Sequence, residues 1–196
     1  MTLMETPQSE KLHQDETKSV LGHPDDLWIF GYGSLMWRPG FSFIERHIAR
    51  VHGYRRSFCI LSHAHRGTVE KPGLVLGLDR GGSCVGVAFR VAAENRQATI
   101  DYLREREQVT GVYLEKTIMA ETGEARSVPA LTYVVDRTHC QYSGRLSDAE
   151  KLKFIRQGQG ISGLNPDYVR STHEHLLTLG IRDVTIARLV AALEEE

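Results

Sequence analysis

The sequence predicts one mixed α+β domain with a largely antiparallel sheet that can close into a barrel. Residues 27 to 91 hold short apolar runs separated by glycine and proline, which is typical of strands joined by turns. A helical segment follows at residues 94–107, then two more strand patterns, and the chain ends in helical patterns. With 196 residues, 41% of them hydrophobic, the chain is long enough to bury one substantial core.

The first strand is predicted at residues 28–30, immediately before a glycine-rich loop. Trp28, Ile29 and Phe30 are bulky and favour β-structure, so they can be buried on both faces of a central strand. Residues 1–26 are polar, carry both charges and show no sustained periodicity. We therefore expect a polar N-terminal extension at residues 1–26 and a folded domain at residues 27–196.

Apolar runs bounded by turn residues predict the remaining strands. Arg55 and Arg56 lie inside one such run, so at least one of them must point out of the sheet, toward an acidic ligand or toward solvent, and solvent is the preferred interpretation. Gly81 and Gly82 form a turn that leads into another strand. These strands are predicted at residues 48–61, 74–78, 84–91, 114–120 and 128–135.

Three helices are predicted after the last strand. Ser147 and Glu150 have the spacing of a capping box, and Gly158 ends that helix. The second helix is predicted at residues 166–179. Pro166 is favoured at the first helical position, and Gly180 ends the helix. Asp183 caps the terminal helix.

The charge and the cysteines exclude several classes of protein. A net charge of -1 gives no electrostatic case for binding nucleic acid or an anionic membrane. Cys59, Cys84 and Cys140 are widely spaced and odd in number, so neither a disulfide framework nor a zinc knuckle is predicted. The chain has no apolar stretch long enough to span a membrane and no signal-peptide core, so we expect a cytoplasmic protein.

No metal site and no cofactor are predicted. His63 and His65 are alternate residues and would share one face of a strand, as metal ligands can. A third ligand with supporting spacing is missing, so a structural or substrate-lining role is the preferred interpretation.

The loop after the first strand is the first candidate binding site. Gly31 and Gly33 can adopt backbone conformations closed to other residues and let a ligand approach the main chain. Successive N–H groups there can bind an anion, and Ser34 adds a hydroxyl. An ordinary tight turn remains the alternative interpretation of this pattern.

The predicted helix at residues 94–107 places one carboxylate on its apolar face. At 100° per residue, Ile100, Leu103 and Glu107 lie on one arc, whereas Glu105 points to nearly the opposite side. Burial would raise the pKa of Glu107 toward the range useful for proton transfer. The residues alone are more typical of a charged helix end without a chemical role.

Several motifs together resemble the ChaC family of γ-glutamylcyclotransferases. They occur in the order of that family and cover roughly residues 27 to 190, which is more specific than any single motif. The motifs are Phe30-Gly31-Tyr32-Gly33-Ser34-Leu35-Met36-Trp37, His65-Arg66-Gly67-Thr68 with Lys71-Pro72-Gly73, Cys84-Val85-Gly86-Val87-Ala88-Phe89-Arg90, and Tyr102-Leu103 with Arg106-Glu107.

The resemblance implies a small, mixed, largely antiparallel β-barrel with flanking helices. It also implies an enzyme that cleaves glutathione to 5-oxoproline and Cys-Gly, with Glu107 at the catalytic position and no cofactor. In this reaction the α-amine of the γ-glutamyl unit attacks its own γ-carbonyl, and one group acts as base and then as acid. The small-molecule substrate is thus the only expected partner, and the oligomeric state stays open.

The resemblance assigns substrate binding to the glycine loop and to two tyrosines. The loop residues are Tyr32, Gly33, Ser34 and Leu35. Tyr113 matches the tyrosine of the family's Gly-Gly-Tyr motif, and Tyr168 resembles a C-terminal tyrosine that the family places against the substrate. Both phenols can hydrogen-bond the substrate, and each is equally well interpreted as an amphipathic core tyrosine. Before Tyr113, Val112 stands where the family commonly has glycine, which puts the local turn in doubt.

Two other functions remain open. The same loop and glutamate suit other γ-glutamyl peptides or γ-glutamylamines, with a different pocket for the rest of the molecule. A regulator that binds such ligands without cleaving them is the non-enzymatic alternative, and the presence of Glu107 is evidence against it.

Overall fold

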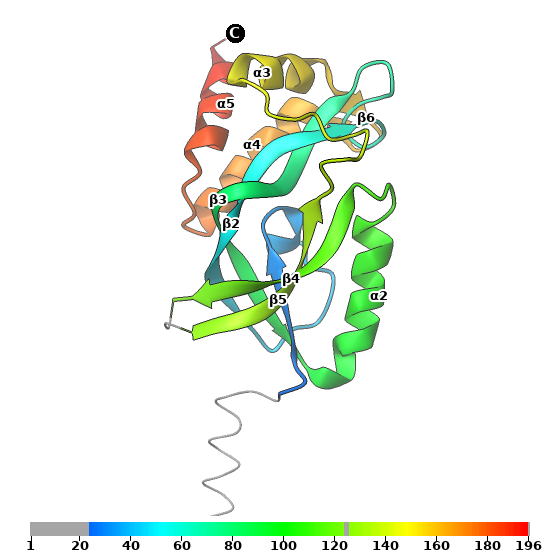
Figure 1. Cartoon of the computed structure of the whole chain (residues 1–196). Coiled ribbons are helices and arrows are strands. Elements are labelled where there is room, and N and C mark those ends of the chain that lie inside the picture. The colour runs from blue at the N-terminus through cyan, green and yellow to red at the C-terminus, as the bar shows by residue number, and fades with distance from the viewer. Residues whose placement is uncertain (1–23, 124–125, 196) are drawn as a thin grey trace, which may run out of the picture.

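The computed structural model describes residues 24–123 and 126–195. Residues 1–23 of the predicted N-terminal extension therefore lie outside the described residues. Figure 1 shows a barrel with one helix along its side and three helices gathered at one end. The strands are β1 Leu27–Gly31, β2 Glu45–Ser62, β3 Gly73–Val91, β4 Tyr113–Thr122, β5 Arg126–Val135, β6 Gln159–Gly160 and β7 Gly163–Leu164; the helices are α2 Arg96–Glu107, α3 Asp148–Gln157, α4 Asn165–Thr178 and α5 Val184–Glu194, with short 3-10 turns η1 Ser34–Met36 and η2 Ala93–Asn95.

The five long strands close into a barrel in the order β1-β3-β2-β4-β5. Neighbouring strands run antiparallel, except that β5 pairs with β1 in parallel, opposing Ala130 to Trp28 and Leu131 to Ile29. The prediction of a mixed, largely antiparallel barrel with flanking helices is confirmed.

All five residues of β1 are buried, as the sequence predicts. Trp28 and Phe30 face the barrel interior, where they pack with residues from every other barrel strand. Ile29 faces outward and packs against Leu103 of α2. Because both faces of β1 are covered, the loop that follows it starts from a fixed position.

One predicted break in the sheet is wrong. The separate strands expected at residues 74–78 and 84–91 are a single strand, β3, which forms a long hairpin with β2. Gly81 (φ 98°) and Gly82 (φ 77°) lie opposite Gly53 (φ 80°), so two residues of β3 face one residue of β2. The two glycines thus form a β-bulge, which bends the strand instead of ending it.

Three helices pack together at the far end of the long β2–β3 hairpin (Figure 1). The capping box of Ser147 and Glu150 at α3 is present. Asp183 caps α5 by accepting hydrogen bonds from the N–H groups of Thr185 and Ile186. Both predicted caps are therefore confirmed. None of the described helices combines the length and the apolar character that a membrane-spanning helix needs.

The two arginines at positions 55 and 56 differ: the side chain of Arg55 is 31% exposed and pairs with Asp79, whereas Arg56 does not point to solvent. Its side chain is only 4% exposed and lies 3.2 Å from the carboxylate of Asp183. It also donates to the backbone carbonyls of Tyr32 and Val85. These acceptors satisfy the buried guanidinium, which ties the end of β1 to β3 and to the cap of α5.

Candidate active site

The seven residues predicted to form the site line one small pocket. Its volume is about 60 Å³, so a peptide substrate would place one end there and extend outward. The predicted residues are Tyr32, Gly33, Ser34, Leu35, Glu107, Tyr113 and Tyr168, and the structure adds Leu76 and Tyr133. The pocket is therefore lined from six places in the fold: the loop after β1, the end of α2, the strands β3, β4 and β5, and α4.

The loop after β1 presents backbone donors to the pocket. Ser34 begins the 3-10 turn η1, whose hydrogen bonds start at the carbonyl of Gly33. Among the described residues, the N–H groups of Gly33, Ser34 and Leu35 have no hydrogen-bond acceptor. These donors can therefore bind a carboxylate or a developing oxyanion.

Neither Gly31 nor Gly33 has a positive φ, so this loop does not use the left-handed conformation that favours glycine. At Gly31 space is tight: a Cβ there would lie 3.1 Å from the Cβ of Leu35, closer than most such contacts. At Gly33 a Cβ would meet only the side chain of Leu76, at an ordinary 3.7 Å. Close packing of the turn on β1 therefore explains the first glycine.

Glu107 is the last residue of α2, and its side chain is 18% exposed. Leu103 on the same arc is fully buried, whereas Glu105 is exposed, as the spacing predicts. Burial raises the pKa of Glu107 above its usual value, and the neighbouring guanidinium of Arg106 opposes this rise. A carboxyl group with a raised pKa is suited to exchange protons near neutral pH.

Arg106 connects this carboxylate to the loop. Its Nε lies 3.1 Å from Oε1 of Glu107, and one Nη donates to the hydroxyl of Ser34 at 2.9 Å. The other Nη donates to the carbonyl of Arg38 at 2.6 Å. One side chain therefore orients both halves of the candidate site.

Three tyrosines in the pocket remain neutral phenols. Burial raises the pKa values of Tyr32, Tyr113 and Tyr168 above that of a free phenol. The hydroxyl of Tyr113 donates to the carbonyl of Leu76 at 2.7 Å. Tyr168 packs edge-on against Phe58, 6.1 Å between ring centres. The phenols therefore offer hydrogen bonds without adding negative charge next to Glu107.

Tyr133 and Leu76 are the pocket residues that sequence reasoning missed. The hydroxyl of Tyr133 donates to Glu115 at 3.2 Å, and Glu115 is held by two hydrogen bonds from Arg104. Both missed residues lie in apolar strand patterns, where nothing distinguishes them from core residues. Only the folded structure shows that both side chains line the pocket.

The substitution of valine for the family glycine leaves the next turn well packed. Val112 is 2% exposed and packs with Ile60 and Val135. Its carbonyl accepts a hydrogen bond from the N–H of Asp136. Tyr113 directly after it still reaches the pocket, so valine at this position is compatible with the site.

Of the two alternate histidines, His65 has a hydrogen-bond partner in the structure. The Nδ1 of His65 lies 2.9 Å from the hydroxyl of Ser162. Within the described ranges, no group of three or more His, Cys, Asp or Glu side chains could hold a metal ion.

Comparison with known proteins identifies the family. A model of the ChaC-like protein family matches residues 27–196. The chain belongs to the ChaC-like family. This assignment confirms the resemblance found in the sequence motifs.

Curated members of the ChaC-like family are similar over most of this chain. The glutathione-specific γ-glutamylcyclotransferase of Escherichia coli (strain K12) is 33% identical and covers 88% of this chain and 75% of its own length. The human glutathione-specific γ-glutamylcyclotransferase 1 is 34% identical and covers 88% of this chain and 80% of its own. A crystal structure of the yeast γ-glutamylcyclotransferase specific to glutathione has a TM-score of 0.78 to this structure at 21% sequence identity. The match covers 87% of this chain and 96% of the yeast chain, and it supports the assignment of the fold.

Proposed function

We propose that this protein is a γ-glutamylcyclotransferase that cleaves glutathione into 5-oxoproline and Cys-Gly. The observation that carries the proposal is the position of Glu107, a partly buried carboxyl group that shares one pocket with the free N–H groups of Ser34 and Leu35. Membership of the ChaC-like family and the names of the curated relatives support glutathione as the substrate.

Glu107 acts as the proton carrier of the reaction. Its carboxylate takes a proton from the α-ammonium of the γ-glutamyl unit, and the resulting amine attacks the γ-carbonyl carbon. The new C–N bond closes a five-membered lactam, and the peptide C–N bond breaks. The lactam nitrogen loses a second proton as the ring closes. Glu107 passes the two protons in turn to the departing cysteine nitrogen, which leaves as an ammonium group, so atoms and charge balance without a further reactant.

The loop and the tyrosines hold the substrate in a curled conformation. The amine and the carbonyl belong to one flexible chain, so fixing their approach removes a large part of the barrier. The N–H groups of Gly33, Ser34 and Leu35 bind the substrate carboxylate or the oxyanion that develops at the γ-carbonyl. Tyr113 and Tyr168 add neutral hydroxyl groups at the wall of the pocket.

Product analysis by mass spectrometry tests this proposal. Purified wild-type protein is incubated with glutathione and, separately, with γ-glutamyl dipeptides and γ-glutamylamines. We expect 5-oxoproline and Cys-Gly from glutathione, and Glu107→Gln should lower the rate by about 10² to 10⁴. Glu105→Gln is the matched control, because Glu105 is exposed on the same helix.

The other outcomes separate the alternatives. Turnover of other γ-glutamyl compounds but not of glutathione would keep the chemistry and reject the substrate. Binding of glutathione without any product would favour the regulator. Equal activity of Glu107→Gln and wild type would reject Glu107 as the proton carrier.

A further inference from the structure

A second pocket lies away from the candidate active site and is lined by basic side chains. Its volume is about 400 Å³, and its lining residues are Arg55, Ser57, Gly144, Arg145, Leu146 and Lys151. None of them lines the pocket that contains Glu107. Three separate parts of the fold supply its positive charges: strand β2, the loop before α3, and α3 itself.

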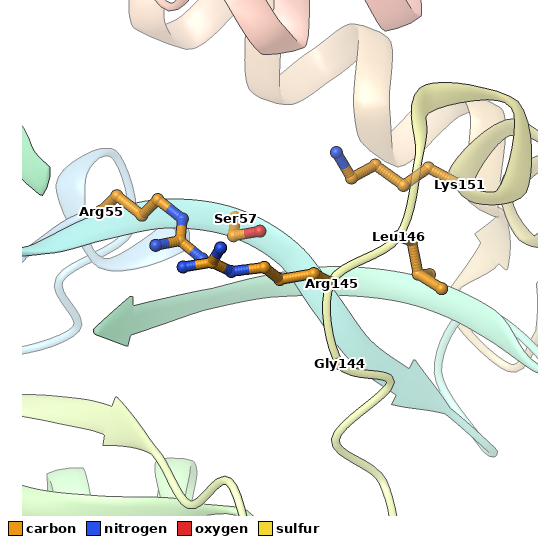
Figure 2. Close-up of a pocket in the computed structure, with 6 residues that line it drawn as sticks. All are labelled: Arg55, Ser57, Gly144, Arg145, Leu146 and Lys151. Atoms are coloured by element: carbon orange, nitrogen blue, oxygen red, sulfur yellow. The ribbon is translucent and has the colours of Figure 1, made fainter. Parts of the chain in front are cut away.

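The two arginines of this pocket face each other. Figure 2 shows the side chains of Arg55 and Arg145 extending toward each other beside Ser57, while the ammonium group of Lys151 lies apart from the two guanidinium groups, above them in this view. The protein as a whole has a net charge of -1, so this cluster does not reflect a generally basic surface. Positive charges brought this close repel one another, and a bound anion would offset this repulsion.

The carboxylates nearby do not balance these charges. Asp79 is shared by Arg55 and Arg137, at 2.6 and 2.7 Å. Asp148 is shared in the same way, by Lys151 and by Arg188, each at 3.2 Å. The guanidinium of Arg145 has no carboxylate partner anywhere in residues 24–123 and 126–195.

We propose that this pocket binds a phosphate-bearing small molecule. A phosphate group carries up to two charges on several oxygens, whereas a single carboxylate carries one, so phosphate offsets the charges of the two arginines and Lys151 more fully. The hydroxyl of Ser57 is a further donor. The volume lies within the range of small-ligand pockets and leaves room for an organic group beyond the phosphate.

The test uses the full chain with two simple probes, inorganic phosphate and pyrophosphate, at constant ionic strength. Calorimetry measures affinity, and NMR of the backbone amides locates the site. We expect saturable binding of both probes, with shifts at Ser57 and Gly144. Arg145→Ala should weaken binding about tenfold, the loss of roughly one charged hydrogen bond.

The control variant is Arg170→Ala, which removes one exposed arginine from α4, outside this pocket. It should leave the affinity unchanged. Absence of saturable binding to wild type would overturn the proposal, as would equal weakening by Arg170→Ala and Arg145→Ala, which would indicate non-specific attraction. Glutathione is a third probe: if it shifts Ser57 and Gly144 as strongly as phosphate does, the pocket binds carboxylates and the phosphate assignment is wrong.

Discussion

Arg106 and Glu107 are consecutive residues at the end of α2, and their side chains form an ion pair with 3.1 Å between Nε and Oε1. The same guanidinium donates to the hydroxyl of Ser34, 72 residues earlier in the chain. The position of the candidate proton carrier and that of the binding loop therefore depend on one side chain.

Replacing Arg106 should impair catalysis without removing the reacting group. We expect Arg106→Ala to lower kcat by about 10²-fold, because a small displacement of Glu107 or Ser34 disturbs the geometry in which the substrate amine approaches the γ-carbonyl. Loss of the nearby cation should also raise the pKa of Glu107 further. The acid side of the pH–rate profile should therefore move to higher pH. Arg96→Ala, at the other end of α2, should leave the profile unchanged; a lower kcat without a shifted profile would contradict this role.

The raised pKa of Glu107 predicts a pH-dependent cost to stability. The folded protein holds this proton more tightly than the unfolded chain, so stability falls as pH rises from the usual pKa of glutamate to the raised value. Glu107→Gln removes this loss. The variant should melt at a higher temperature than wild type at pH 8, and the difference should shrink toward pH 4. Thermal unfolding at both pH values checks this, with Glu105→Gln as a control that should show no pH-dependent difference.

Asp79 should stabilise the barrel through its charge. Its side chain is 2% exposed and lies between the guanidinium groups of Arg55 and Arg137, which lower the pKa of this carboxyl. Asp79→Asn should reduce the free energy of unfolding by about 3 kcal/mol in urea at pH 7, because two arginines lose their shared anion. The contribution is present above the usual pKa of aspartate and is lost as pH falls through the lowered value.

The gap between wild type and Asp79→Asn should therefore narrow in acid. Asp167→Asn, which removes an exposed carboxylate paired with Arg170, should change stability by less than about 1 kcal/mol. Equal losses of unfolding free energy in the two variants would show that the burial of Asp79 does not contribute to stability.

Gly86 should be intolerant of any side chain. A Cβ there would lie 2.2 Å from the carbonyl oxygen of Gly31 and 2.7 Å from the ring of Phe30. Gly86→Ala should force β1 and β3 apart directly before the binding loop, costing about 3 kcal/mol in chemical unfolding. Gly123→Ala is the control, because an added Cβ meets nothing within 4 Å; similar losses in both variants would disprove the steric explanation.

Sequence patterns predicted the type of most elements, because each pattern reflects local burial or a local cap. The buried strand at Trp28 and the cap at Ser147 are examples. The continuity of β3 through Gly81 and Gly82 was not predictable in this way, since glycine pairs also end strands. Its bulge exists only because Gly53 of β2 lies opposite.

The candidate site was predictable to the extent that it lies in motifs. Helical spacing alone placed Glu107 on the face of Leu103, and the family resemblance supplied its role and the two tyrosines. The contribution of Tyr133 depends on which way a barrel strand faces, and the contacts of Arg106 depend on where the loop after β1 packs. Neither property is encoded within a short window of sequence.

The parallel pairing of β1 with β5 determines when the barrel can close during folding. It joins residues about 100 positions apart, such as Trp28 and Ala130, and such distant contacts form slowly because a long stretch of chain must first be brought together. During synthesis the barrel cannot close until residues 126–135, which form β5, have left the ribosome. We infer that the loop after β1 becomes rigid late in folding, so a nascent chain ending before β5 would lack a formed site although it already contains Glu107.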